Sequence, residues 1–297
     1  MKSSKILKVL LVLFLFTVNV NNLTGQPVEK KFFKFTKIVT KYTQLKYIIS
    51  KNVNDTFFVY VRLPKHYNET NRRYPVIYLL DGDIAFNMAT SIVRYLQYGK
   101  FVPDVITVGI GYGTMMSDEE TNFRNRDYTP TQIEGLPNSG HASEYLKFIK
   151  KELIPFIDST YRTDPDDRTL NGYSLGGLFT LYTMLKEPDL FNRYIAGSPY
   201  VYNDVDNLLK TEEKIFKEGN SLHGKLYITV GENESFEKFR NPISRIVNRL
   251  RKRQYKNFDL FFRIFENGQH LICPAEAMSY GLVYVYNNAV TKNLNGE

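Results

Sequence analysis

Gly172, Ser174 and Gly176 stand at the spacing of the pattern G-x-S-x-G. About one chain in ten of this length would contain that pattern by chance, because glycine makes up about 7% of residues. The context is more specific, since a short stretch typical of a strand precedes the pattern and a stretch typical of a helix follows it. Such a turn exposes its serine at the carboxyl edge of a sheet and at the positive end of a helix. We therefore predict that Ser174 is a nucleophile; an ordinary glycine-rich turn is the alternative.

A serine nucleophile needs a general base, and the chain has four histidines. Where this turn occurs, the chain order is serine, then acid, then histidine, so only His223 and His270 are candidates. His223 precedes a predicted strand and therefore lies at the amino edge of the sheet. His270 follows the last predicted strand, at the carboxyl edge where ligands bind. His270 is the predicted base.

The two remaining histidines are expected to have other roles. His66 lies in a predicted turn and is interpreted as a surface residue. His141 lies at a predicted helix start beside a long loop, where capping or exposure to solvent is favoured over contact with a substrate.

The acid that orients the base should follow the strand before the last one, at its carboxyl end. Three glutamates stand there: Glu232, Glu234 and Glu237. We choose Glu234, three residues after Gly231, because it is within the usual reach of the strand end; the others are interpreted as solvated charges. Asp259 opens the last strand at the far edge, and Glu266 lies awkwardly close to His270 on the same turn. The acid would hold the imidazole in one tautomer and stabilise imidazolium.

Acyl transfer also needs two backbone N–H groups that point at the developing oxyanion. One is expected from Leu175, the residue after the nucleophile, and the other from the loop after the early buried strand. The Asp83 amide is the candidate in that loop. A calcium loop built on Asp81 and Asp83 is disfavoured, because no D-x-D-x-D-G series follows. No metal and no organic cofactor is expected for this chemistry.

The elements that position these residues alternate between strand and helix patterns, which is typical of α/β folds with a largely parallel sheet. Strands are predicted at residues 56–63, 74–80, 105–110, 169–172, 194–197, 225–230 and 258–265. Helices are predicted at residues 84–97, 142–157, 176–185, 242–252 and from 274 onward. The first strands follow one another without a helix, so that edge is expected to be antiparallel. Residues 111–140 are predicted to form a long polar loop, and such loops are often functional. The expected fold is the α/β-hydrolase fold.

Residues 1–25 have the pattern of a cleavable signal peptide: three lysines, ten apolar residues at 9–18, and a polar stretch that ends at Gly25. Ten apolar residues are too few for a membrane-spanning helix, which needs about 20, so a membrane anchor is the weaker alternative. We expect export to the periplasm or the extracellular space, no stable membrane insertion after cleavage, and one α/β-hydrolase domain over residues 26–297.

Charge and cysteine content limit the partners and the covalent cross-links that are expected for this chain. Removal of residues 1–25 takes away three lysines and no acids, so the formal net charge falls from +8 to +5. The basic residues from Arg249 to Arg253 lie on a predicted amphipathic helix and are interpreted as a solvated face, so no nucleic-acid partner is expected. Cys273 is the only cysteine, which excludes an internal disulfide. A small-molecule ester is the expected partner.

With these residues in place, the chain resembles the putative esterase family, and most closely its periplasmic siderophore-esterase-like branch. The resemblance spans about residues 56–286. Its motifs are LLDGD (79–83), RDYTP (126–130), YRTDP (161–165), NGYSLGG (171–177), AGSP (196–199) and NGQH (267–270). It implies that Ser174 and His270 are catalytic and that the Asp83 amide is an oxyanion donor. Some members of the branch rely on a Ser–His pair without a firm acid. The branch has a tryptophan-rich stretch after AGSP, where this chain has Tyr200 and Tyr202.

The sequence thus predicts a serine hydrolase that cleaves carboxylic esters through an acyl-enzyme, with a siderophore-type ester among the candidate substrates. An acyltransferase of the same fold and a non-catalytic ligand-binding protein are the alternatives. Arg126 and Tyr128 are candidates for lining the pocket, and the competing interpretation is that Arg126 and Asp127 form an ion pair that braces the loop.

Overall fold

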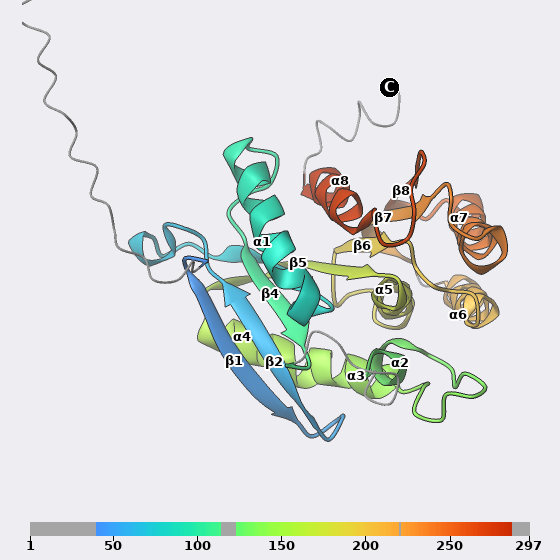
Figure 1. Ribbon diagram of the computed structural model, residues 1–297, viewed down its shortest axis with the longest axis horizontal. Helices are drawn as coiled ribbons and strands as arrows, with labels where there is room; N and C mark the ends of the chain where they lie inside the picture. The colour runs from blue at the N-terminus through green and yellow to red at the C-terminus, as the bar shows by residue number, and fades with distance from the viewer. Residues whose placement is uncertain (1–39, 114–122, 220, 287–297) are drawn as a thin grey trace, which may run out of the picture. The chain divides into compact units, whose positions relative to one another are not determined.

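The computed structural model describes residues 40–113, 123–219 and 221–286. From Thr40 onward these residues belong to one unit, which is built around an eight-stranded sheet (Figure 1). The central strands β3 (Tyr74–Leu79), β4 (Ile106–Gly111) and β6 (Arg193–Gly197) are almost wholly buried, as the continuous apolar runs of their sequences require.

The strand order is β1-β2-β4-β3-β5-β6-β7-β8. The remaining strands are β1 (Thr43–Ser50), β2 (Asp55–Arg62), β5 (Thr163–Tyr173), β7 (His223–Gly231) and β8 (Asn257–Phe265). The pairs β1–β2 and β2–β4 are antiparallel, and every pair from β4 to β8 is parallel. The predicted antiparallel edge and the α/β-hydrolase layout are therefore confirmed. The parallel strands place their carboxyl ends at one edge of the sheet.

Helices cover both faces of the sheet. They are α1 (Gly82–Tyr98), α2 (Phe123–Tyr128), α3 (Ala142–Phe148), α4 (Ile154–Thr160), α5 (Leu175–Lys186), α6 (Val205–Lys217), α7 (Asn241–Arg253) and α8 (Pro274–Tyr286), with a π-helical turn at Ile149–Leu153 between α3 and α4 and another at Phe236–Arg240. Successive side chains of β3 alternate between the faces, so Ile77 and Leu79 pack towards α1 and α8, and Tyr78 packs in the core on the other face. Figure 1 shows α1 and α8 next to each other on one side of the sheet.

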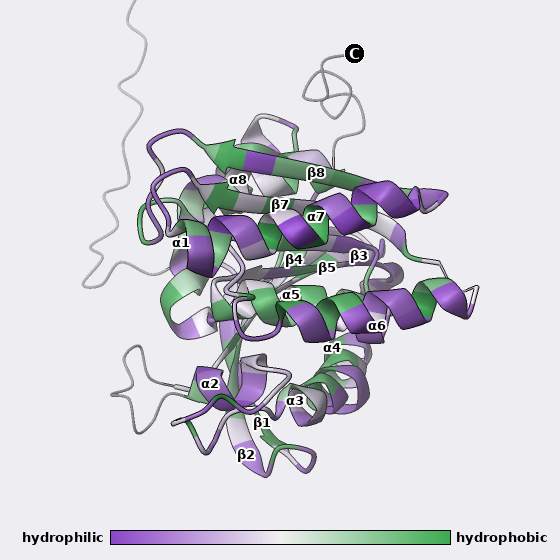
Figure 2. Cartoon of the chain, turned by 90° about the vertical axis from the view of Figure 1, so that its right-hand side faces the viewer, coloured by the Kyte–Doolittle hydropathy of each residue, from purple (hydrophilic) through white to green (hydrophobic). Residues whose placement is uncertain are grey.

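On the opposite face α5 is buried along most of its length, whereas α6 and α7 are amphipathic. Figure 2 shows hydrophilic residues along their outward faces. The basic residues predicted as a solvated face on α7 are partly ion-paired: Arg249 and Arg253 contact Glu212 and Glu213 of α6. These pairs join the two outer helices.

Several elements differ from the sequence predictions. β1 and α6 were not predicted, and β5 begins six residues earlier than the predicted strand at 169–172. The predicted polar loop at 111–140 contains the helix α2. The predicted signal peptide at 1–25 lies outside the described residues. Within the part of the chain that the structure describes, no helix is long and apolar enough to cross a membrane.

Candidate active site

Ser174 lies on the turn between β5 and α5, with φ 58° and ψ −118°. This backbone conformation is strained for a residue with a Cβ, and it is the geometry that lifts a side chain out of a strand-to-helix turn. The turn is possible because its neighbours are small: a Cβ on Gly172 would lie 2.2 Å from the carbonyl oxygen of Gly176. A Cβ on Gly177 would lie 2.9 Å from the carbonyl oxygen of Gly197. The pattern G-x-S-x-G thus forms the predicted elbow.

His270 reaches Ser174 from the loop that follows β8. Its Nε2 lies 2.9 Å from Ser174 Oγ. The Tyr173 hydroxyl donates a hydrogen bond of 2.7 Å to the carbonyl oxygen of His270, and the imidazole ring lies against Tyr173 and Phe239, with centroid distances of 5.2 and 4.6 Å. The hydrogen bond from Tyr173 therefore holds the backbone of His270, and the two aromatic rings hold its imidazole. With Nδ1 protonated, Nε2 is free to accept the serine proton.

Glu234 completes the group from the turn after β7. Its Oε2 lies 2.9 Å from His270 Nδ1, and its Oε1 accepts a hydrogen bond of 2.8 Å from the Gly231 N–H. The Ser198 hydroxyl donates to the same carboxylate, 2.6 Å from Oε1. Burial alone would raise the pKa of Glu234, but the hydrogen bonds from His270, Ser198 and Gly231 outweigh it and hold that pKa below its ordinary value. The carboxylate therefore stays ionised beside the imidazole.

The other two candidate glutamates lie elsewhere. Glu237 is exposed and lies in the π-helical turn before α7. Glu232 is also exposed, and its carboxylate accepts a hydrogen bond of 2.9 Å from the Asn267 N–H, which ties the turn after β7 to the loop that carries His270. Of the three, the structure brings only Glu234 to His270.

The two predicted oxyanion donors lie at the ends of neighbouring strands. Leu175 is the first residue of α5, directly after Ser174, and Asp83 is the second residue of α1, just after β3. The Asp83 carboxylate accepts hydrogen bonds from the Tyr60 hydroxyl (2.7 Å) and from two backbone N–H groups, those of Tyr112 (2.5 Å) and Gly113 (3.0 Å). This side chain fixes the start of α1 against the end of β4. The oxyanion role of the two amides stays a prediction.

A cavity of about 640 Å³ opens beside Ser174 and His270. Its lining is mainly apolar, from the start of α1, the loop after His270 and the start of α8: Ile84, Ala85, Met88, Leu271, Pro274, Ala277 and Met278. Asp81 and Arg124 also line it and form a salt bridge, with Arg124 Nε 2.6 Å from Asp81 Oδ1. The cavity can therefore enclose an uncharged group next to the serine.

Arg126 does not line this cavity. Its guanidinium contacts Asp127 (2.8 Å) and Asp55 (2.8 Å), which confirms the interpretation that Arg126 and Asp127 form an ion pair. Tyr128 is fully buried, and its hydroxyl accepts a hydrogen bond of 3.2 Å from the Asp81 N–H. The prediction that Arg126 and Tyr128 line the substrate pocket was wrong for the cavity beside Ser174, because Tyr128 is buried and Arg126 is directed at Asp127 and Asp55 instead. Arg124, two residues earlier, was missed.

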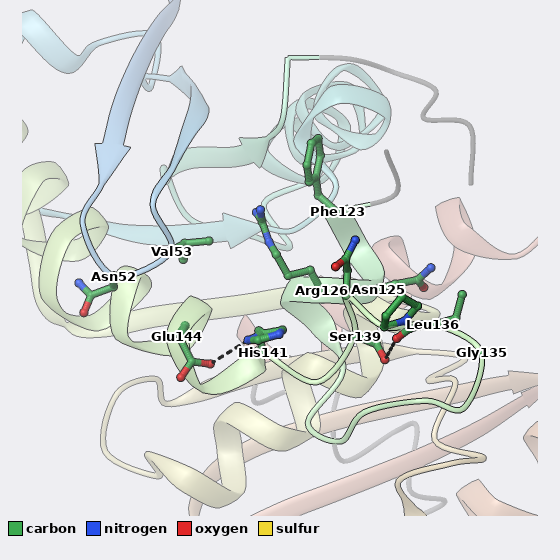
Figure 3. Close-up of a pocket in the computed structure, with 12 residues that line it drawn as sticks. Asn52, Val53, Phe123, Asn125, Arg126, Gly135, Leu136, Ser139, His141 and Glu144 are labelled. Carbon is green, nitrogen blue, oxygen red and sulfur yellow. Dashed lines mark hydrogen bonds and ion pairs between the residues drawn. The ribbon is translucent and has the colours of Figure 1, made fainter. Parts of the chain in front are cut away.

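Arg126 faces a second cavity, of about 690 Å³, formed by the β1–β2 turn, α2 and the loop before α3 (Figure 3). His141 lies in its wall, with Nδ1 3.9 Å from a carboxylate oxygen of Glu144. The His141 side chain makes no capping hydrogen bond to α3 and is about half exposed, so the prediction of a surface residue is confirmed and that of a cap is wrong.

The other two histidines lie away from Ser174. His66 is a surface residue, as predicted, and its Nδ1 lies 2.7 Å from a carboxylate oxygen of Glu69. His223 opens β7 at the amino edge of the sheet, as predicted, and lies 3.6 Å from Asp189. Within the described ranges, no group of three or more His, Cys, Asp or Glu residues could hold a metal ion.

Comparison with known proteins agrees with this geometry. The family model described as "Putative esterase" matches residues 50–270, which include the elbow and the Glu234 and His270 positions. The ferri-bacillibactin esterase BesA of Bacillus subtilis (strain 168) is 33% identical over 214 residues, covering 67% of this chain and 73% of that protein.

Two solved structures share the fold over most of their length. The BES protein from Bacillus cereus has a TM-score of 0.76 at 26% identity, covering 86% of this chain and 99% of that one. An IroE-like serine hydrolase from Shewanella oneidensis has a TM-score of 0.72 at 26% identity, covering 82% of this chain and 80% of that one. The chain belongs to the putative esterase family and is a serine ester hydrolase with the α/β-hydrolase fold.

Proposed function

We propose that Ser174, His270 and Glu234 form a catalytic triad that hydrolyses carboxylic esters through an acyl-enzyme. The observation that carries this proposal is the continuous contact of 2.9 Å from Ser174 Oγ to His270 Nε2 and of 2.9 Å from Nδ1 to Glu234. The base is then within hydrogen-bond reach of both the nucleophile and the orienting acid without any movement.

In the first half of the reaction, His270 Nε2 takes the hydroxyl proton as Ser174 Oγ attacks the ester carbonyl. The amides of Leu175 and Asp83 stabilise the oxyanion. His270 then returns the proton to the leaving alcohol as the C–O bond breaks and the acyl-enzyme remains. In the second half, His270 deprotonates water, which attacks the acyl-enzyme, and the serine recovers its proton while the carboxylic acid leaves. Glu234 keeps the imidazole in the required tautomer and stabilises imidazolium.

The proposed substrate class is a siderophore-type ester. Support comes from BesA, which is described as a ferri-bacillibactin esterase and aligns with 67% of this chain. The 640 Å³ cavity is large enough for one arm of such a molecule beside Ser174. We also propose export to the periplasm or the extracellular space, on the pattern of residues 1–25. N-terminal sequencing of the mature protein tests this, with a start after Gly25 as the expected result.

Treatment with a fluorophosphonate probe tests the chemistry. We expect a mass shift on the peptide that contains Ser174, and no shift in Ser174→Ala. Hydrolysis of a siderophore ester, an acylated sugar and a short aryl ester should then be compared, with added alcohol to detect transfer to an acceptor other than water. An unlabelled serine in folded protein would overturn the triad, and hydrolysis of the other two esters alone would overturn the substrate class.

A further inference from the structure

Ser198 lies directly after β6, in a loop that joins the nucleophile to the neighbouring strands. The loop is hydrogen-bonded to the elbow on both sides: the Ser174 N–H donates to Gly197 O, and the Tyr200 N–H donates to Ser174 O, each at 3.0 Å. The Ser198 N–H donates to Thr229 O of β7, also at 3.0 Å. Ser198 therefore has a fixed backbone position between the turn that carries Ser174 and the strand that leads to Glu234.

The backbone of Ser198 is unusual. Its φ is +38°, a value that favours glycine, and the residue is only 1% exposed. It also precedes Pro199, which restricts the conformation further. A serine at such a position has a strained backbone, and strain of this kind is typical of functional sites. The Ser198 side chain is therefore expected to have a role that offsets the strain of its backbone.

That side chain points at the carboxylate of Glu234. Ser198 Oγ lies 2.6 Å from Oε1 and 2.5 Å from Oε2, so its single proton is shared over both oxygens. It also lies 3.5 Å from His270 Nδ1. The hydroxyl thus contacts both carboxylate oxygens beside the Glu234–His270 hydrogen bond, and a donor in that position restricts rotation of the carboxylate.

We propose that Ser198 is a positioning residue of the esterase reaction. It acts through the Glu234 carboxylate on the relay of hydrogen bonds that joins Ser174, His270 and Glu234. This inference rests on the proposed function. Without the hydroxyl, Glu234 keeps its hydrogen bond from Gly231 on one oxygen only, and the carboxylate is free to rotate away from Nδ1. The imidazole then loses both its orientation and the stabilisation of its charged form.

Few other ionisable groups face the relay. Tyr173 approaches from the end of β5, and burial together with the charge of Glu234 raises its pKa. Cys273 approaches from the residue before α8, and burial, with the charges of Glu276 and Glu234, raises its pKa as well. The raised pKa values keep both groups neutral, so neither adds a charge beside Glu234.

The test compares Ser198→Ala and Ser198→Gly with the wild-type protein on one aryl ester. Both variants remove the hydroxyl donor, so we expect kcat to fall roughly ten-fold with KM nearly unchanged. The part of the acid limb of the kcat profile that reflects protonation of Glu234 should move to higher pH, because a carboxylate with one donor fewer binds its proton more readily. Ser198→Gly also relieves the positive φ, so its melting temperature should equal or exceed that of the wild type although its kcat is reduced.

Ser50→Ala is the matched control, since Ser50 is also buried and hydrogen-bonded but lies at the end of β1. It should leave the pH profile in place. An unshifted acid limb and an unchanged kcat in Ser198→Gly would overturn the proposal, while fluorophosphonate labelling of Ser174 would still support the triad. Absence of labelling in the wild type would instead overturn the triad itself.

Discussion

Glu234 is only 6% exposed, and removal of a carboxylate from water normally raises its pKa. Here three donors from different elements reverse that effect: the Gly231 N–H, the Ser198 hydroxyl and His270 Nδ1. The folded protein therefore holds this carboxyl ionised more strongly than the unfolded chain does. The same contacts that keep the acid charged also fix the direction in which it meets the imidazole.

This arrangement couples stability to pH. Because the folded pKa of Glu234 lies below the ordinary value of 4.5, its contribution to the free energy of unfolding is complete above that value and is lost as the pH falls through the folded pKa. Glu234→Gln cannot titrate there. The stability difference between wild type and Glu234→Gln, measured by denaturant unfolding, should therefore shrink as pH is lowered from 6 towards 3. A difference that is constant over that window would contradict the expectation.

The same variant should lose activity by roughly 10²- to 10⁴-fold in kcat, since an amide selects the wrong tautomer of the imidazole. Glu237→Gln is the control, because Glu237 is exposed and makes no contact with His270. Initial rates on an aryl ester give the kcat of Glu234→Gln and of Glu237→Gln. Equal losses in the two variants would contradict the assignment of Glu234.

At this scale, much of the site follows from the sequence. Ser174 and His270 were identified by a motif and by the edge of the sheet, and Glu234 by its distance from Gly231. Ser198 and Arg124 were not predicted, because their roles depend on contacts across the fold: Ser198 meets a carboxylate 36 positions away, and Arg124 meets Asp81 43 positions away. For Ser198 the sequence held one signal, a serine between a strand end and Pro199.

The strand-to-helix elbow is the element on which the site depends most directly. Gly172→Ala would place a Cβ 2.2 Å from Gly176 O, so we expect a loss of about 2–5 kcal/mol of stability or a failure to fold. Gly176→Ala, whose Cβ would lie 3.2 Å from Asp81 Oδ2, should be milder. Gly135→Ala is the control: nothing lies within 4 Å, and only its positive φ costs about 1 kcal/mol. Thermal melting ranks the three, and Gly172→Ala melting above Gly135→Ala would contradict this account.

Elements with a clear periodicity of buried apolar residues were predicted. Most elements whose apolar residues are few or face solvent were not. β1 was missed because its alternating apolar residues face solvent: Leu45, Tyr47 and Ile49 are 57%, 70% and 72% exposed. α2 was missed because six residues inside a polar stretch give no helical periodicity. α6 was within reach of the sequence, since Val205, Leu208 and Ile215 have helical spacing and are all buried.

Across the whole molecule, the cavity beside Ser174 exists because α1 and α8 meet on one face of the sheet. Met88→Trp in α1 should narrow it, and kcat/KM for an ester with a long acyl chain should fall about ten-fold more than for an acetate. Ser91→Trp is the control, because Ser91 lies on the exposed side of the same helix. A chain-length series of aryl esters measures the effect, and parallel losses for all lengths would contradict a role of the cavity in selectivity.

The position of β8 in the sheet has a consequence for how the enzyme loses activity on heating. β8 lies at the border of the sheet, hydrogen-bonded to β7, and the loop after it carries His270. Border strands open more readily than central ones, so the imidazole should leave the serine during partial openings that spare the core around β3 and β5. Heat inactivation should therefore run several degrees ahead of the loss of circular dichroism. A cysteine pair that staples β8 to β7 should bring the two temperatures together and lengthen the working half-life of the catalyst.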